Sequence, residues 1–254
     1  MNRMKFANGR LVALGGAVLL LASGCNALSG GDSSGDGTDG GTTDPLAEEM
    51  RSWPGGCDVL DNLQPIVDYM QIQEIDGGAL NNNAWGEGMD GEALTCNGLV
   101  TVKSFELADG TISENDGELW GGIVPWENED QAKASYTQRT VDDIEGLKEQ
   151  DSTLQVIEEI PLGDEWDEGK LIVMDREFEW ALTLIGRQGQ WLFYAEVNYN
   201  HDTGEELYNE NSDILPGSEE DYAYPFDDAA LQQWLVEEYA PSVNQMINDR
   251  IGQE

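Results

Sequence analysis

The segment FEWALTLIGRQGQWLFYAEVNYN, residues 178–200, decides the fold. Apolar side chains occupy every second position on both sides of the GRQG turn: Phe178, Trp180, Leu182 and Leu184 before it, then Trp191, Phe193, Ala195, Val197 and Tyr199 after it. A period of two puts these side chains on one face of two strands, and the glycine-containing turn predicts that the strands pair as a hairpin. Such a hairpin needs other elements to cover its apolar face.

The flanking segments supply those elements. Further strands are predicted over residues 94–107, 119–126, 153–160 and 170–178, and helices over 47–53, 57–71 and 127–146, the last one stopping at Gly146. A final helix is predicted to begin at Asp227 or Asp228, to be interrupted at Pro241 and to resume with Val243, Ile247 and Ile251. This order predicts an α+β domain, an antiparallel β-sheet with flanking helices packed on one face.

The first 24 residues predict a signal peptide. Arg3, Lys5 and Arg10 precede an apolar run of about a dozen residues, which is shorter than the ~20 that a spanning helix needs. The following ASGC, residues 22–25, resembles the lipobox of bacterial lipoproteins, although Ala22 stands where leucine is commonest. The resemblance implies cleavage before Cys25, palmitate-type acyl chains on that residue, and anchoring to the outer, extracytoplasmic face of the cell membrane. The alternative is ordinary secretory cleavage, which would leave Cys25 as a free thiol.

A flexible tether is predicted after Cys25. Residues 25–45 are rich in glycine, serine, threonine and aspartate and carry no apolar pattern. Residues 46–254 contain neither an internal repeat nor a second linker, so we expect them to form one extracytoplasmic domain.

The cysteine count predicts one disulfide. The chain has three cysteines, and acylation of Cys25 would leave Cys57 and Cys96 as a pair in an oxidising compartment. Closing this loop is worth about 3–4 kcal/mol by the chain-entropy treatment. No close cysteine pair is available for a metal site, and His201 is the only histidine in the sequence.

The chain is strongly acidic, with 51 Asp and Glu against 12 Lys and Arg, a net charge of −39. This charge repels nucleic acid and anionic lipid headgroups, so we expect no nucleic-acid partner, and attachment to the membrane falls to the lipid. Adaptation to high salt is the favoured explanation of the charge. A weak calcium motif at Asn198, Asn200 and Asp202 is one alternative, although Thr203 stands where an EF-hand has glycine. A cationic partner is another.

Several short motifs resemble those of a known group. CDVL, residues 57–60, opens a helix, a second cysteine lies in the following strand, and PLGDEW, residues 161–166, precedes another strand. With the lipobox and the tether, these resemble actinobacterial cell-surface lipoproteins of unknown function, loosely related to the extracytoplasmic sensor domains of bacterial Ser/Thr kinases. The resemblance implies a disulfide-bonded domain that binds or senses, and it brings no catalytic residues or cofactor.

The sequence predicts a binding protein rather than an enzyme. It contains no G-x-S-x-G elbow, no H-E-x-x-H and no phosphate-binding glycine loop between a strand and a helix. The ligand-pocket candidates are expected to lie between the sheet and the flanking helix: Trp180, Trp191, Phe193 and Trp234. A pocket there would hold a small-molecule or protein ligand. The alternatives are a passive protein-interaction module of a cell-envelope complex, which would have a filled core and an exposed apolar patch, and a secreted hydrolase.

Overall fold

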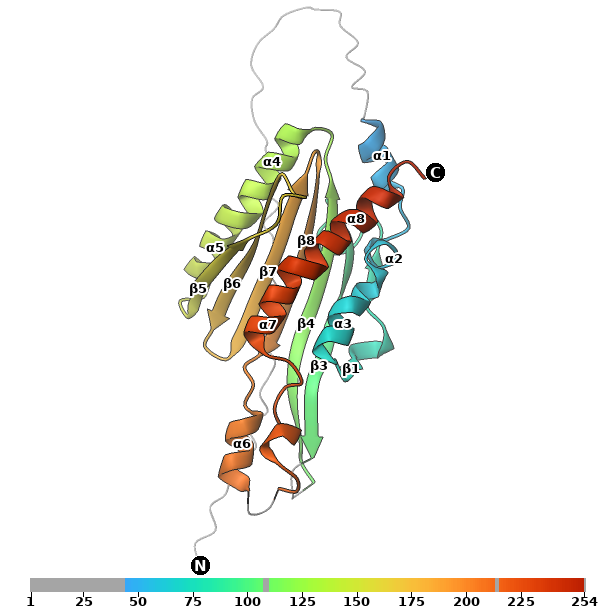
Figure 1. The fold of residues 1–254 in the computed structure, drawn as a ribbon. Helices are drawn as coiled ribbons and strands as arrows, with labels where there is room; N and C mark the ends of the chain where they lie inside the picture. Colours follow the sequence, from blue (N-terminus) through green and yellow to red (C-terminus); the bar gives the residue numbers. More distant parts are fainter. Residues whose placement is uncertain (1–43, 107–109, 213–214, 254) are drawn as a thin grey trace, which may run out of the picture. The chain divides into compact units, whose positions relative to one another are not determined.

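The computed structural model describes residues 44–106, 110–212 and 215–253. In this part of the chain an eight-stranded sheet has the order β1-β3-β4-β8-β7-β6-β5, with β2 also paired to β3, and every pairing is antiparallel (Figure 1). The strands are β1 (Glu74–Ile75), β2 (Asn81–Asn83), β3 (Leu94–Glu106), β4 (Ile112–Pro125), β5 (Leu154–Pro161), β6 (Glu168–Arg176), β7 (Glu179–Gln188) and β8 (Trp191–Asn200). The predicted α+β class, with flanking helices and one disulfide, is confirmed.

The predicted hairpin is formed by β7 and β8. The two strands pair along their whole length, and Gln188 lies opposite Trp191. The turn is therefore only Gly189 and Gln190, shorter than the predicted GRQG, and Gly189 has a φ of 53° that glycine adopts without strain. The prediction for Phe178 was wrong: this residue lies in the tight turn between β6 and β7 and is 71% exposed.

Helices cover both faces of the sheet, so the prediction of helices on one face was wrong. On β8, Phe193 and its alternate neighbours belong to the main hydrophobic core, whereas Leu192 and Tyr194 point to the other face and pack with Ala132 of α4. The main core is covered by helices from both ends of the domain: α1 (Pro45–Arg51), α2 (Gly56–Val59), α3 (Gln64–Met70), α7 (Asp228–Trp234) and α8 (Ala240–Arg250). The second face is covered by α4 (Glu129–Thr137) and α5 (Asp143–Gln150).

Shorter helical segments complete the described chain. Three are 3₁₀ turns, namely η1 (Asp61–Leu63), η2 (Asp76–Gly78) and η4 (Glu219–Asp221). Two are π-helical, η3 (Gln138–Asp142) and η5 (Leu235–Tyr239), and α6 (Gly204–Asn211) follows β8. The helix predicted over residues 57–71 is divided by η1, because Asp61, Asn62 and Leu63 all have a positive φ, near 50°.

The last helical run is continuous across Pro241, where an interruption was predicted. The Asp227 side chain accepts a hydrogen bond from the Ala230 N–H, which confirms the predicted cap of α7. Proline lacks an N–H and its ring would meet a carbonyl of the preceding α-helical turn. Here that turn is the π-helical η5, in which the Ala240 N–H bonds to the Leu235 carbonyl, and Pro241 lies in the first turn of α8. The stop predicted at Gly146 was also wrong, since α5 continues to Gln150.

The start of the folded part differs slightly from the prediction. Asp44 caps α1 by accepting a hydrogen bond from the Leu46 N–H, and its side chain also accepts one from Gln190. Asp44 and Pro45 were assigned to the tether, but they belong to the folded domain. The predicted signal peptide, residues 1–24, Cys25 and the tether up to residue 43 lie outside the described residues. Among the described helices, none is long and apolar enough to cross a membrane.

Candidate functional site

A groove of about 540 Å³ lies on the outer surface of the helical layer that covers the main core. It is open to solvent along its length and runs between α2 with η1 on one side and α8 with the residues after it on the other. Its lining residues are Asp58, Val59, Asp61, Ser242, Gln245, Met246, Asp249, Arg250 and Gln253. The groove is therefore formed by residues from near the start and near the end of the described chain.

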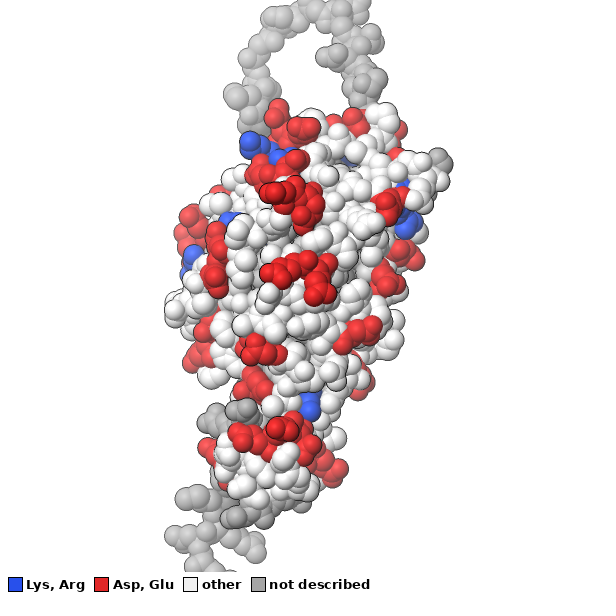
Figure 2. Space-filling model, viewed as in Figure 1, with Lys and Arg blue, Asp and Glu red and all other residues white. Residues whose placement is uncertain are grey.

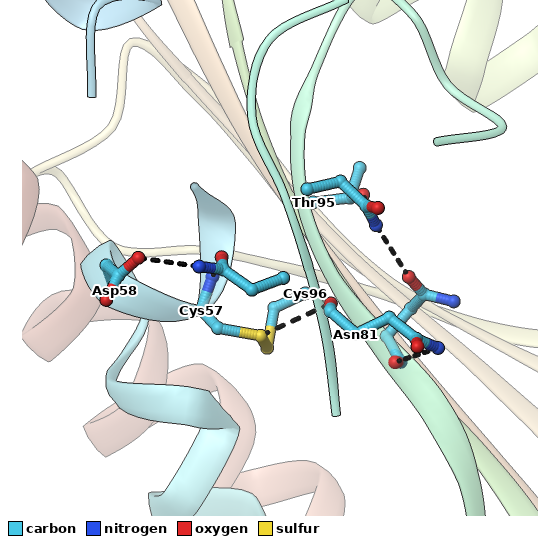
Figure 3. The surroundings of a disulfide bond; sticks show 8 residues. Cys57, Asp58, Asn81, Thr95 and Cys96 are labelled. Atoms are coloured by element: carbon cyan, nitrogen blue, oxygen red, sulfur yellow. Dashed lines mark hydrogen bonds between the residues drawn. A yellow bond between two sulfur atoms is a disulfide. The ribbon is translucent and has the colours of Figure 1, made fainter. Parts of the chain in front are cut away.

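The wall of the groove formed by α2 is fixed to the sheet by the predicted disulfide. Cys57 is bonded to Cys96 of β3, with the two Cα atoms 4.6 Å apart. Figure 3 shows Asn81 of β2 beside this bond. The Asn82 side chain accepts a hydrogen bond from the Cys57 N–H (2.9 Å) and donates one to the Asp58 carboxylate (2.6 Å). The disulfide and Asn82 together hold Asp58 at the groove.

The lip that carries Asp61 is shaped by the left-handed turn η1. This turn sends two leucines, Leu60 and Leu63, down onto the sheet, where they are 1% and 0% exposed. They meet β4 at Gly121, where an added Cβ would lie 2.7 Å from Leu63 and 2.9 Å from Leu60. A side chain at Gly121 would therefore force the Leu60 and Leu63 side chains, which hold η1 on the sheet, to move.

The groove is negatively charged. Three carboxylates line it, on Asp58, Asp61 and Asp249, and none of them forms an ion pair with another described residue. The one lining cation is Arg250, which is already in contact with the protein. Its guanidinium lies 5.3 Å from the ring centre of Trp53 and donates to the Asp58 carbonyl at 3.4 Å.

A buried hydroxyl lies in the main core, beneath the helical layer that carries the groove. Tyr239 of η5 is 2% exposed, and its hydroxyl has no hydrogen-bond partner among the described residues. Burial, and after it the negative charge of Asp61, raises the pKa of Tyr239. The phenol is therefore an unused hydrogen-bond donor that lies within the electrostatic reach of a groove carboxylate.

A smaller cleft of about 280 Å³ opens on the same helical layer. It is lined by Tyr69, Ala230, Gln233, Trp234, Glu237 and Glu238. The rings of Tyr69 and Trp234 are stacked at 4.4 Å, and Trp234 also stacks on Tyr239 at 5.5 Å. Gln233 donates a hydrogen bond to Glu237. Aromatic faces beside carboxylates form a surface that favours cations.

The four predicted pocket residues do not line a common cavity in the structure. Trp191 and Phe193 are 2% and 0% exposed and pack against the ring of Trp166 in the main core. Trp180 lies against His201, 5.0 Å between ring centres, and Trp234 alone lines one of the two grooves. Without a rearrangement of the core, Trp191 and Phe193 have no access to a ligand.

The three calcium candidates have different surroundings. Asn198 and Asn200 lie on β8, with side chains on the face that carries α4 and α5. Both carboxylate oxygens of Asp202 already accept backbone hydrogen bonds, from the Gly204 N–H at 2.9 Å and the Tyr224 N–H at 2.6 Å. Asp202 thereby fixes the loop that leads from β8 into α6.

A buried ion pair lies under α4 on the second face of the sheet. The Arg139 guanidinium donates to the Asp90 carboxylate at 2.9 Å, and the Tyr194 hydroxyl donates to the same oxygen at 3.0 Å. Arg139 also lies over the Tyr194 ring, 5.0 Å from its centre, and Trp120 donates to the Tyr194 hydroxyl. This network fixes both η3 and the loop that precedes β3 to the sheet. We therefore assign it a role in stability.

Three glutamates lie on the same face of the sheet: Glu118 on β4, Glu196 on β8 and Glu179 on β7. Burial raises the pKa of each of them. For Glu118 and Glu196 a neighbouring glutamate raises it further, and the charge of Arg176 partly opposes the shift in all three. Neither of the two grooves is lined by these side chains.

Acidic side chains are spread over the surface rather than gathered at one place. Figure 2 shows them on most parts of the face that carries α7 and α8, with few lysines and arginines between them. Such an acidic surface is the kind expected of a protein adapted to high salt, and it repels other acidic surfaces.

The groove was missed by the sequence analysis, because nothing in the sequence relates residues 58–61 to residues 242–253. The four aromatic candidates were found from their periodicity, which marks burial as readily as ligand contact. No protein-family model matches the chain and no curated protein is similar to it, so its resemblance to actinobacterial lipoproteins stays a prediction.

Proposed function

We propose that this protein is an extracytoplasmic lipoprotein, anchored through Cys25, that binds a partner at the cell surface through the groove between α2–η1 and α8. The observation that carries the proposal is the contrast between a packed interior and an open groove. The aromatic residues that face the sheet are buried against one another, whereas the groove of about 540 Å³ lies on the outer surface. Small-molecule sites usually enclose most of their ligand, and an open groove suits a protein segment better.

The construction of the groove supports the same proposal. Its α2 wall is held by the disulfide Cys57–Cys96 and by Asn82, so its shape is set before a partner arrives. A preformed surface loses little conformational entropy on binding. The acyl anchor and the tether would keep such a module close to partners in the membrane.

The test uses the full chain in its own cells, with a photo-reactive amino acid at Gln245 in the groove. A matched control carries the same amino acid at Glu158, which is exposed on β5. We expect a discrete crosslinked partner from Gln245 and none from Glu158. Equal labelling from the two positions, or none from either, would overturn the proposed function.

The anchor is tested separately with a Cys25→Ser variant. Fractionation of cells should find the native chain in the membrane pellet and the variant in the medium or the soluble fraction. Partition of the variant with the membrane to the same extent would refute acyl anchoring through Cys25 and leave the groove proposal standing.

A further inference from the structure

The two grooves of the helical layer have the same chemistry. Each combines carboxylates with apolar or aromatic surface: Asp61 and Asp249 with Val59 and Met246 in the larger groove, and Glu237 and Glu238 with Tyr69 and Trp234 in the smaller cleft. Both border the same helical run, since η5 supplies Glu237 and Glu238 and α8 supplies Ser242 to Arg250.

From this arrangement we propose that the partner segment held in the groove is basic, an extended stretch of a protein with at least two lysine or arginine side chains. This inference rests on the proposed function and names the chemistry of its partner. One cationic side chain lies along the large groove against Asp61 and Asp249. A second lies over the stacked rings of Tyr69 and Trp234, beside Glu238.

Charge complementarity selects this occupant. The carboxylates of the large groove form no ion pair within the described residues, and the only lining cation, Arg250, contacts Trp53 and the Asp58 carbonyl. A guanidinium or ammonium group entering the groove would therefore meet unpaired carboxylates. The aromatic rings of Tyr69 and Trp234 add a cation–π attraction for such a group.

A second observation comes from Tyr239. Its hydroxyl is buried, lacks a hydrogen-bond partner among the described residues, and is close enough to Asp61 to feel its charge. An unpaired polar atom in a packed region lowers the stability of the fold, and a cation bound at Asp61 would offset the negative charge that acts on this phenol.

Charge opposes the other occupants considered. A second copy of this chain carries the same net charge of −39, the tether after Cys25 is itself acidic, and an anionic lipid surface would be repelled by the groove carboxylates. Free polyamines share the cationic chemistry, but an open groove would leave most of a small molecule exposed to water.

The test measures binding of hexalysine to the full chain in detergent, at a series of salt concentrations from about 0.1 to 1 M. The variant Asp61→Asn/Asp249→Asn removes two groove charges and keeps side-chain size, and asparagine tolerates the left-handed backbone at position 61. The control Glu149→Gln/Glu158→Gln removes two exposed charges elsewhere. We expect the groove variant to bind about five- to tenfold more weakly and the control to change by less than about twofold.

Three results would overturn the inference. Equal losses in the groove variant and in the control would show diffuse attraction to an acidic protein. Groove-dependent binding of spermine without groove-dependent binding of hexalysine would assign the site to a small polyamine. Crosslinking from Gln245 that is equally strong in the Asp61→Asn/Asp249→Asn chain would leave the proposed function intact and refute a basic partner.

Discussion

The buried ion pair between Asp90 and Arg139 gives the sharpest prediction on stability. Asp90 is 6% exposed and accepts hydrogen bonds from Arg139 and from the Tyr194 hydroxyl. The variant Asp90→Asn keeps the size of the side chain and an acceptor oxygen but removes the charge. Arg139, whose side chain is 18% exposed, would then keep its charge in a poorly solvated place, with only the exposed Glu92 carboxylate, 4.0 Å away, as an ion-pair partner.

The cost follows from this partial burial. Removing one partner of a buried ion pair costs about 3–5 kcal/mol. We expect the lower end of this range, about 3 kcal/mol, because Arg139 still reaches solvent. For a domain of this size, that loss lowers the melting temperature by about 6–12 °C.

The assay is thermal and urea unfolding followed by tryptophan fluorescence at one fixed salt concentration. The matched control is Glu158→Gln, an exposed site with the same change of charge, which should be neutral or slightly stabilising because the chain is so acidic. The double variant Asp90→Asn/Arg139→Gln should recover part of the loss, since it removes the stranded charge. An Asp90→Asn protein as stable as the control would refute the buried pair.

Three further predictions concern the core, the disulfide and pH. Phe193→Ala should lower the free energy of unfolding by about 3–5 kcal/mol in urea titrations. Phe178→Ala, in an exposed turn, should change it by less than about 0.5 kcal/mol. Similar losses at both sites would contradict the assigned faces of β7 and β8. Replacing Cys57 and Cys96 together by serine should cost about 3–4 kcal/mol by calorimetry, and an unchanged transition would mean that the bond does not form. Burial raises the folded-state pKa of Glu196 above its usual 4.5, so the folded state binds this proton more tightly than the unfolded state does. The free energy of unfolding therefore falls as the pH rises from the usual pKa through the raised one. Glu196→Gln should flatten this fall and stabilise the protein at neutral pH, and an unchanged pH profile would contradict the burial of Glu196.

The central part of the fold was predictable because its signals are local. The alternating residues of β7 and β8 specify a buried face through a period of two, and Gly189 supplies the turn. The cysteine count predicted the Cys57–Cys96 bond, which the structure contains. The cap at Asp227 was also visible, because aspartate before a helix accepts an N–H from its first turn.

What escaped prediction depends on contacts between distant residues. Apolar positions on both faces of β8, such as Leu192 beside Phe193, carry the second helical layer, and their pattern does not say which helix covers which face. The π-helical η5 before Pro241 depends on packing in the main core. The groove needs Asp61 and Asp249 to come together, although they lie near opposite ends of the domain's sequence. No local pattern encodes such a contact.

The claim that binding takes place on the surface of a closed domain is tested most directly by native mass spectrometry of the protein extracted from its own membrane at high salt. We expect a polypeptide that carries acyl mass on Cys25 and retains no small molecule in its core. A stoichiometric small-molecule mass that is lost on denaturation, in the native chain and equally in a variant with the groove blocked by Ser242→Trp, would contradict it. Such a result would show that the core around Trp191 and Phe193 opens to a ligand.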